Sequence, residues 1–112
     1  MKRTSSLKKN RQFRIVYNRG KSVANRYLVM FVLKNRDGGN RLGISISKKV
    51  GKSVTRNRIR RRIKESYRHM EHGVKIGYDV IVIARQPASQ ATYKEIDSGL
   101  RHLLYKQGLL ES

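Results

Sequence analysis

Near the N-terminus, apolar positions recur at helical rather than alternating spacing. Phe13, Val16 and Tyr17 lie three and four positions apart, which places them on one face of a helix. Gly20 follows, and glycine commonly ends a helix because it accepts the backbone conformation needed there. The pattern therefore predicts a helix over about residues 10–19.

The next apolar stretches have the length and residue types of β-strands. Residues 22–24 are predicted as a short strand, and residues 27–34 (YLVMFVLK) as a strand buried on at least one face. Residues 37–40 (DGGN) have the composition of a tight turn. They predict that residues 27–34 form a hairpin with the strand that follows, residues 41–47.

The strand predicted at residues 41–47 (RLGISIS) alternates cleanly between its two faces. One face is apolar and consists of Leu42, Ile44 and Ile46. The other face is made mostly of small residues: Arg41, Gly43, Ser45 and Ser47. Because small side chains leave the backbone open, we expect that a large group can lie close to the sheet on this second face.

The remaining residues predict a helix, a strand and a second helix. Thr55 is the expected N-cap of a helix that runs to about residue 71. Residues 78–84 (YDVIVIA) form a nearly continuous apolar run, which is typical of a central strand. Residues 92–95 (TYKE) have capping-box spacing and open the last helix. The apolar face of that helix comprises Ile96, Leu100, Leu103 and Leu104.

The resulting element order is α-β-β-β-α-β-α. It predicts an α/β (α+β) two-layer sandwich in which one mixed sheet of about four strands packs with three helices. A chain of 112 residues has the length of one domain, so residues 1–112 are predicted to form a single domain. No stretch has the length and apolarity of a membrane-spanning helix or of a secretory signal. The chain also lacks cysteine, and we expect a cytoplasmic protein.

The second predicted helix combines an apolar stripe with a high density of cations. Residues 48–64 contain nine Lys and Arg residues. In helical projection one side gathers Ile59, Ile63, Ser66, Tyr67 and Met70. The opposite side carries Asn57, Arg61, Lys64 and Arg68, with Arg58 and Arg62 on one flank and Arg60 on the other. The helix is therefore predicted to pack through its isoleucines and to present cations outward, beside an N-terminus whose free N–H groups suit phosphate.

The net charge indicates what these cations are for. The chain has 27 Lys and Arg residues against 7 Asp and Glu residues, a formal charge of +20 and a pI near 11.2. So large a surplus repels itself, and a polyanionic partner, above all nucleic acid, explains it best. An anionic membrane is the weaker alternative, because the apolar stripes are expected to face a core. A merely solvated helix face, with Glu65 pairing Arg61, leaves most of the cations unbalanced.

The sequence offers no set of residues for catalysis or metal binding. The acidic residues are scattered singly between Asp37 and Glu111, whereas a Mg²⁺ site needs several carboxylates together. His69 and His72 stand at a helix end, where a cation is favourable in any case. Residues 51–53 (GKS) end like a phosphate-binding loop, but Ile46 occupies the position of its first glycine. We expect no catalytic residue and no metal site in the polypeptide.

One stretch of the chain resembles a known family. Residues 41–65 (RLGISISKKVGKSVTRNRIRRRIKE) are similar to the signature of the protein subunit of bacterial ribonuclease P, in which an Arg-Asn-Arg helix follows such a strand and lysine loop. The likeness extends to residues 7–9 (LKK) with Phe13, Tyr17 and Gly20, and to residues 79–89. Nearly the whole chain is covered by the resemblance.

The resemblance implies a protein that assists a catalytic RNA. That RNA, with Mg²⁺ held mainly by the RNA itself, would cut the 5′ leader from precursor transfer RNA, and this chain would be a single RNA-binding domain. Contacts to the catalytic RNA would come from Lys52, Arg56, Asn57, Arg58, Arg60, Arg61 and Lys64. The leader would lie in a cleft lined by Phe13, Tyr17, Phe31, Ser45, Lys48 and Lys49. The resemblance also implies a left-handed β-α-β crossover, and no membrane or obligate protein partner is evident.

Fold and charge alone leave other interpretations open. A ribosomal protein or an RNA chaperone fits both. A binder of duplex DNA fits less well, because the basic helix lacks the compact three-helix context of such modules. For Phe13 and Tyr17, ordinary core packing is the alternative to stacking on unpaired bases.

Overall fold

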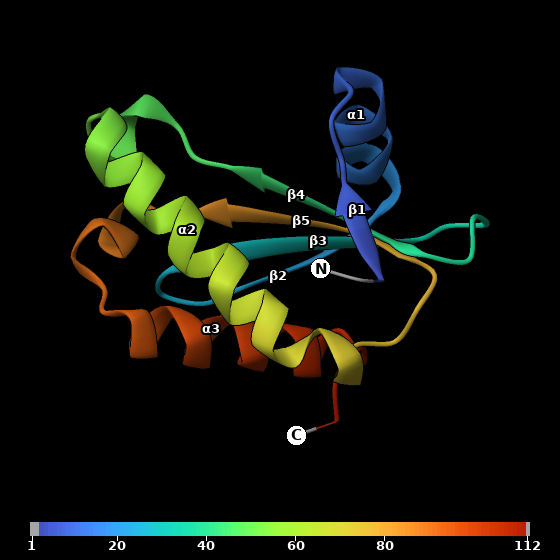
Figure 1. Ribbon diagram of the computed structural model, residues 1–112. Coiled ribbons are helices and arrows are strands. Elements are labelled where there is room, and N and C mark those ends of the chain that lie inside the picture. Colours follow the sequence, from blue (N-terminus) through green and yellow to red (C-terminus); the bar gives the residue numbers. More distant parts are fainter. Residues whose placement is uncertain (1–2, 112) are drawn as a thin grey trace.

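The computed structural model describes residues 3–111 and contains one five-stranded sheet with three α-helices (Figure 1). Residues 1, 2 and 112 of the predicted domain lie outside the described residues. In chain order the elements are β1 (Thr4–Ser6), α1 (Asn10–Arg19), β2 (Lys21–Ala24), β3 (Leu28–Lys34), β4 (Asn40–Ser45), α2 (Ser53–Met70), β5 (Tyr78–Ala84) and α3 (Tyr93–Lys106). Short 3-10 turns lie at Lys48–Val50, Glu71–Gly73 and Gln86–Gln90. The mixed α+β class and the three helices agree with the sequence-based prediction, whereas the sheet has one strand more.

The additional strand is β1. It pairs in parallel with β4, so that Thr4 lies opposite Asn40 and Ser6 opposite Leu42. Its residues are all polar, so it has no hydrophobic alternation that a sequence pattern could reveal. Tertiary contacts hold it instead: Thr4 is buried and its hydroxyl lies 3.0 Å from the Tyr67 hydroxyl of α2.

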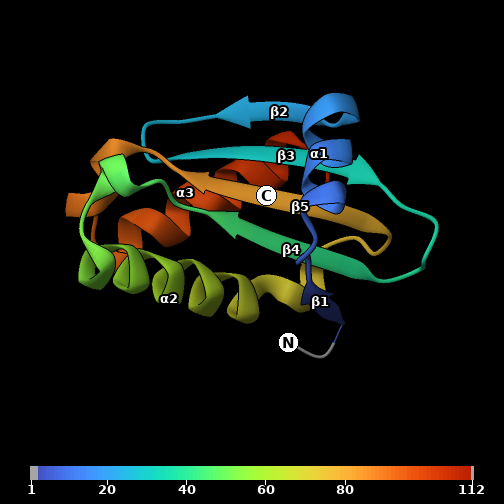
Figure 2. The same cartoon turned by 90° about the horizontal axis from the view of Figure 1, so that it is seen from above.

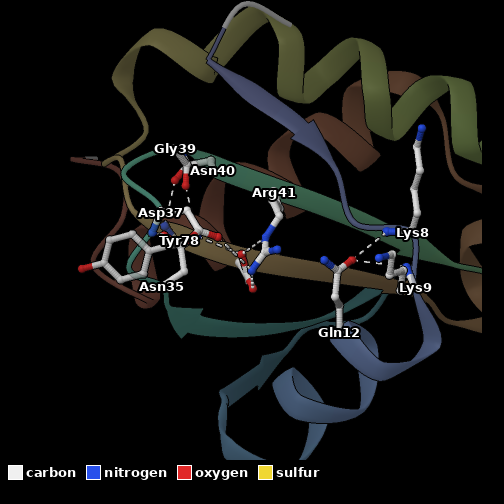
Figure 3. A network of polar contacts seen from close by, with 10 residues as sticks. Lys8, Lys9, Gln12, Asn35, Asp37, Gly39, Asn40, Arg41 and Tyr78 are labelled. Atoms are coloured by element: carbon white, nitrogen blue, oxygen red, sulfur yellow. Dashed lines mark hydrogen bonds and ion pairs between the residues drawn. The ribbon is translucent and has the colours of Figure 1, made fainter.

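The hairpin predicted between residues 27–34 and 41–47 is wrong. The strand order is β1-β4-β5-β3-β2, so β5 lies between β3 and β4, antiparallel to β3 and parallel to β4. Two asparagines hold the start of β5 in this gap. Asn35 donates to Asp79 Oδ1 (2.9 Å), and Asn40 Oδ1 accepts from the backbone N–H groups of Gly77 (2.8 Å) and Tyr78 (2.9 Å; Figure 3). A turn sequence marks where the chain reverses, but it does not say which strand becomes the neighbour.

The two faces of the sheet carry different layers. Helices α2 and α3 cover one face, where their apolar side chains pack against alternate residues of the central strands, such as Met30, Leu42 and Val82. All the residues predicted for these two apolar stripes are buried: Ile59, Ile63, Ser66, Tyr67, Met70, Ile96, Leu100, Leu103 and Leu104. Helix α1 packs on the opposite face, where Val16 meets Leu7 and Ile81 in a second, smaller cluster.

The connection from β4 through α2 to β5 is a left-handed crossover. Seen from the α1 side, β4 and β5 both point to the left in Figure 2, β5 lies above β4, and α2 packs on the far face. Most parallel strand-helix-strand units have the opposite hand. The crossover agrees with what the family resemblance implied. It brings the N-terminus of α2 to the end of the sheet that α1 leaves uncovered (Figure 2).

The N-caps of α2 and α3 test two predictions. Helix α2 begins at Ser53 with Lys52 as its N-cap residue, so the prediction of Thr55 as N-cap is wrong by three residues. At α3 the predicted capping box is present. Thr92 Oγ1 accepts from the Glu95 N–H (3.1 Å), and the Glu95 carboxylate accepts from the Thr92 N–H (2.9 Å). These bonds satisfy two N–H groups that the helix itself leaves without partners.

Thr92→Ala is therefore expected to lower the free energy of unfolding by about 1 kcal/mol. The matched control is Thr55→Ala, because Thr55 lies inside α2 rather than at its N-cap; its effect should stay within about 0.5 kcal/mol. Urea denaturation of both variants measures the difference. A loss at Thr55 as large as that at Thr92 would contradict the assignment of the caps.

Candidate nucleic-acid interface

Three arginines of α2 fasten neighbouring segments of the chain. Arg58 donates to the carbonyl of Ser89 (2.8 Å), Arg62 to that of Ala91 (2.6 Å) and Arg60 to that of Ile44 (3.1 Å). These side chains are half-buried along the flanks of the helix. A guanidinium has five N–H donors, so each arginine keeps donors for a further partner. The sequence placed all three on the flanks of the helix but gave no sign that they bind carbonyls far along the chain.

The outer side of α2 presents polar side chains that have no such internal role. Within residues 3–111, the side chains of Lys52, Asn57, Arg61 and Lys64 are exposed and make no hydrogen bond or ion pair. Arg56 lies beside them and donates to Ser53 Oγ (3.2 Å) at the start of the helix. We refer to Lys52, Arg56, Asn57, Arg61 and Lys64 as the outer face of α2. Together with Arg58 and Arg60, it contains all the residues that the resemblance assigns to contacts with the catalytic RNA.

The ion pair between Glu65 and Arg61, which a merely solvated helix face would contain, is not formed. Glu65 instead accepts from Arg68 (2.6 Å) and lies 2.8 Å from His69 Nε2. The hydrogen bonds from Arg68 and then His69 lower the pKa of Glu65 to about 2. The acid of α2 is thus occupied at the C-terminal half of the helix, and Arg61 stays available to an external anion.

On the opposite face of the sheet, three aromatic rings form a row, which we call the aromatic row. The ring centroids of Phe13 and Tyr17 lie 6.1 Å apart, and those of Tyr17 and Phe31 lie 5.1 Å apart, edge to face. Phe13 rests on Gly43, where an added Cβ would lie 2.7 Å from Phe13 Cζ. The large group expected on the small face of β4 is therefore, at this position, a phenylalanine of the same chain. Phe13 and Phe31 are half-buried, but Tyr17 remains 36% exposed, so core packing accounts for Tyr17 least.

The other predicted leader-binding residues lie further along the same face. Gly43, Ile81 and Phe31 lie side by side on three neighbouring strands. Ser45 lies two residues further along β4, opposite Ile83. Lys48 and Lys49 follow in the exposed 3-10 turn after β4, where the Ser47 hydroxyl accepts from the Lys49 N–H (3.2 Å). Figure 2 shows that α1 covers one end of this face and that no helix of the described chain covers the end toward this turn. The surface therefore runs from aromatic rings to lysines.

A part-buried ion pair that sequence reasoning missed lies at the other end of the same face. Arg41 contacts both carboxylate oxygens of Asp79, each at 2.8 Å, and Asp79 is 5% exposed (Figure 3). The hydrogen bonds to Asp79 raise the pKa of Arg41. Two features of the sequence could have revealed this pair. An aspartate interrupts the apolar run of residues 78–84, and an arginine stands on the otherwise small second face of β4. Because Arg41 and Asp79 lie directly opposite each other in the pairing of β4 and β5, the ion pair stabilises this register.

The described residues contain no group of three or more His, Asp or Glu side chains that gather as metal ligands. The carboxylates of Glu65 and Asp79 are held by arginines, as described above. No helix in this part of the chain is long and apolar enough to cross a membrane.

A comparison with known proteins identifies the family. The profile of the family described as Ribonuclease P matches residues 1–108. The chain belongs to this family. Among ribonuclease P protein components, that of Clostridium botulinum (strain Loch Maree / Type A3) is 54% identical over 94% of this chain and 96% of its own length. That of Clostridioides difficile (strain 630) is 52% identical over 91% and 90%.

Solved structures of ribonuclease P proteins have the same fold. The Staphylococcus aureus protein has a TM-score of 0.88 and 40% identity, covering 95% of this chain and 97% of the other. The Thermotoga maritima protein has a TM-score of 0.83 and 30% identity, covering 91% and 96%. Membership makes this chain the protein component of a ribonucleoprotein and implies an RNA partner. It favours this interpretation over a ribosomal protein, an RNA chaperone or a duplex-DNA binder. The assignment of individual residues to the catalytic RNA or to the leader stays a prediction.

Proposed function

We propose that this ribonuclease P protein binds its catalytic RNA through the outer face of α2, with Arg58 and Arg60. The 5′ leader of precursor transfer RNA lies along the aromatic row and toward Lys48 and Lys49. The protein thereby assists the endonucleolytic cut that gives the mature 5′ end, and it acts in the cytoplasm.

The observation that carries this proposal is the separation of two RNA-binding chemistries onto opposite sides of one sheet. The outer face of α2 offers cations free of ion pairs within residues 3–111, which suit the phosphates of a folded RNA. The aromatic row offers the edge and face of a ring, with lysines further along in the turn after β4, which suits a single strand whose bases are unstacked. A leader is such a strand, whereas the catalytic RNA presents mainly folded helices.

In this proposal the polypeptide positions RNA and takes no part in bond cleavage. Mg²⁺ would be held mainly by the RNA and supply the activation of the attacking water, for which the described side chains offer no ligand set. Arg61 and Lys64 would hold phosphates of the catalytic RNA, and Tyr17 would hold a leader base. Their effect would be to fix the substrate in its cutting position.

Reconstitution tests the proposed function. Catalytic RNA alone, protein alone and both together are incubated with precursor transfer RNA at low Mg²⁺, and release of the leader is measured. We expect cleavage by both together, faster than by the RNA alone, and none by the protein alone. Mg²⁺-dependent cleavage by RNA-free protein, or no effect of the protein on the RNA, would overturn the proposal.

Arg61→Ala tests the outer face of α2 directly. The variant should weaken binding of the catalytic RNA and reduce the slope of log K against log salt by about 0.7–0.9 for each phosphate that the protein no longer neutralises. Arg61 is preferable to Arg58 for this purpose, because Arg58 also holds the Ser89 carbonyl. The control is Arg36→Ala, which removes an exposed arginine from the loop between β3 and β4, far from α2 in the chain. An unchanged slope for Arg61→Ala would reduce this arginine to a solvated side chain.

A further inference from the structure

An open groove lies on the outer side of α2, beside the first residue of α3. Its volume is about 700 Å³, and its walls are formed by Arg58, Arg61, Arg62, Lys64, Arg68 and Tyr93, with Glu65. The volume is that of a site for a small molecule or one nucleotide. Among these lining residues Tyr93 supplies the aromatic ring, and the aliphatic stems of the arginines add to the apolar wall.

Tyr93 is held in place from both directions along the chain. It is the first residue of α3, directly after the Thr92 capping box. The segment before it is fastened to α2, because Arg58 and Arg62 donate to the carbonyls of Ser89 and Ala91. The ring is 37% exposed, and its hydroxyl has no hydrogen-bond partner among the described residues. A partly open ring on such a fixed segment of backbone can accept a flat partner at low entropic cost.

The charge of the groove favours an anionic occupant. Five cationic side chains line it against one carboxylate, Glu65, which Arg68 and His69 already hold. Cations around one aromatic face suit a nucleotide whose base is unstacked, since the ring takes the base and the cations take the phosphate. A base-paired helix offers phosphates but no free base face to Tyr93.

We propose that the groove binds an unpaired nucleotide of the catalytic RNA, with its base stacked on Tyr93 and its phosphate held by Arg61 and Arg62. The assignment to the catalytic RNA rests on the function proposed above, because Arg61 and Lys64 belong both to this groove and to the outer face of α2. The groove lies on the far side of the sheet from the aromatic row, so the leader is assigned elsewhere. Tyr93 would therefore set which unpaired position of the RNA the protein recognises.

The test compares variants of Tyr93 that separate stacking from packing. Binding of the catalytic RNA alone, without substrate, is measured by titration for Tyr93→Ala, Tyr93→Leu and Tyr93→Phe. Loss of a stacked base should raise Kd about 5- to 150-fold for the Ala and Leu variants, whereas the Phe variant should stay within about twofold of the natural chain. Chemical probing of the bound RNA should show one unpaired base protected by the natural chain and by the Phe variant, but reactive with Tyr93→Ala.

Each other outcome has a distinct meaning. If the natural chain does not bind the catalytic RNA, the proposed function fails. If it binds and Arg61→Ala weakens binding while Tyr93→Leu does not, the outer face of α2 stands and the stacking site is refuted. The stacking site on the catalytic RNA would also be refuted if Tyr93→Leu weakened only the binding of leader-bearing substrate. The groove would then bind the substrate instead of the catalytic RNA. Melting temperatures identify any variant that is impaired by misfolding, and the Leu variant retains apolar bulk for this reason.

Discussion

Ile63→Ala is expected to lower the free energy of unfolding by about 2–5 kcal/mol. Ile63 is fully buried in the core between α2 and the sheet, so removing its side chain leaves a cavity that neighbours such as Ile59 and Tyr67 fill only in part. Domains of this size are stable by about 5–15 kcal/mol, so this one change removes a large share. Denaturant titration gives the loss directly.

The adjacent residue provides the control. Lys64→Ala removes an exposed side chain from the same helical turn and should change the free energy of unfolding by no more than about 0.5 kcal/mol. The same variant should nevertheless weaken binding to the catalytic RNA. Similar stability losses at both positions would mean that α2 does not divide into a core side and an RNA side.

Tyr17→Ala should weaken binding of precursor transfer RNA by the holoenzyme about 5- to 150-fold when the leader is several nucleotides long. Binding of mature transfer RNA should stay nearly unchanged, because it has no leader to stack. Since Tyr17 is 36% exposed, the stability cost should fall below the roughly 3–5 kcal/mol of an emptied aromatic core site. The discriminating measurement is affinity as a function of leader length.

The matched control for Tyr17 is Tyr105→Ala. Tyr105 is 53% exposed on α3, on the opposite side of the sheet, and should have no leader-dependent effect. Equal losses of affinity for precursor and mature transfer RNA in Tyr17→Ala, accompanied by a large drop in melting temperature, would show that Tyr17 serves the core instead.

Sequence reasoning succeeded mostly where a single element determines the answer. The N-cap of α2 is the exception, because Lys52 makes no side-chain capping bond and leaves no cap signal in the sequence. The stripe from Ile59 to Met70 was readable because helical periodicity alone decides which residues share a side. The capping box of Thr92 and Glu95 could be predicted because both of its residues belong to one turn of the chain. The outward direction of Arg61 followed from the buried direction of Ile63.

It failed where the answer depends on a distant segment. Strand β1 has only polar residues, and its existence depends on β4 and on Tyr67. The neighbour of β3 in the sheet was misassigned because β5, which follows α2 in the chain, lies between β3 and β4. The carbonyl contacts of Arg58, Arg60 and Arg62 could not be foreseen, since a helical projection places a side chain on a flank without saying what backbone lies beside it. The proximity of Tyr93 to the cations of α2 has the same origin.

The central position of β5 also determines the order in which the molecule can assemble. During synthesis β3 and β4 appear first, but the strand that joins them is not made until residues 78–84 have been translated. Until then β3 and β4 lack the strand that lies between them. Ile81, against which Val16 of α1 packs, is also not yet present. Pairing between segments so far apart in the chain is slow, and the exposed strands are prone to aggregate meanwhile. The two sides of the sheet are therefore completed together and late, so a nascent chain stalled within α2 lacks both of the surfaces that we propose bind RNA.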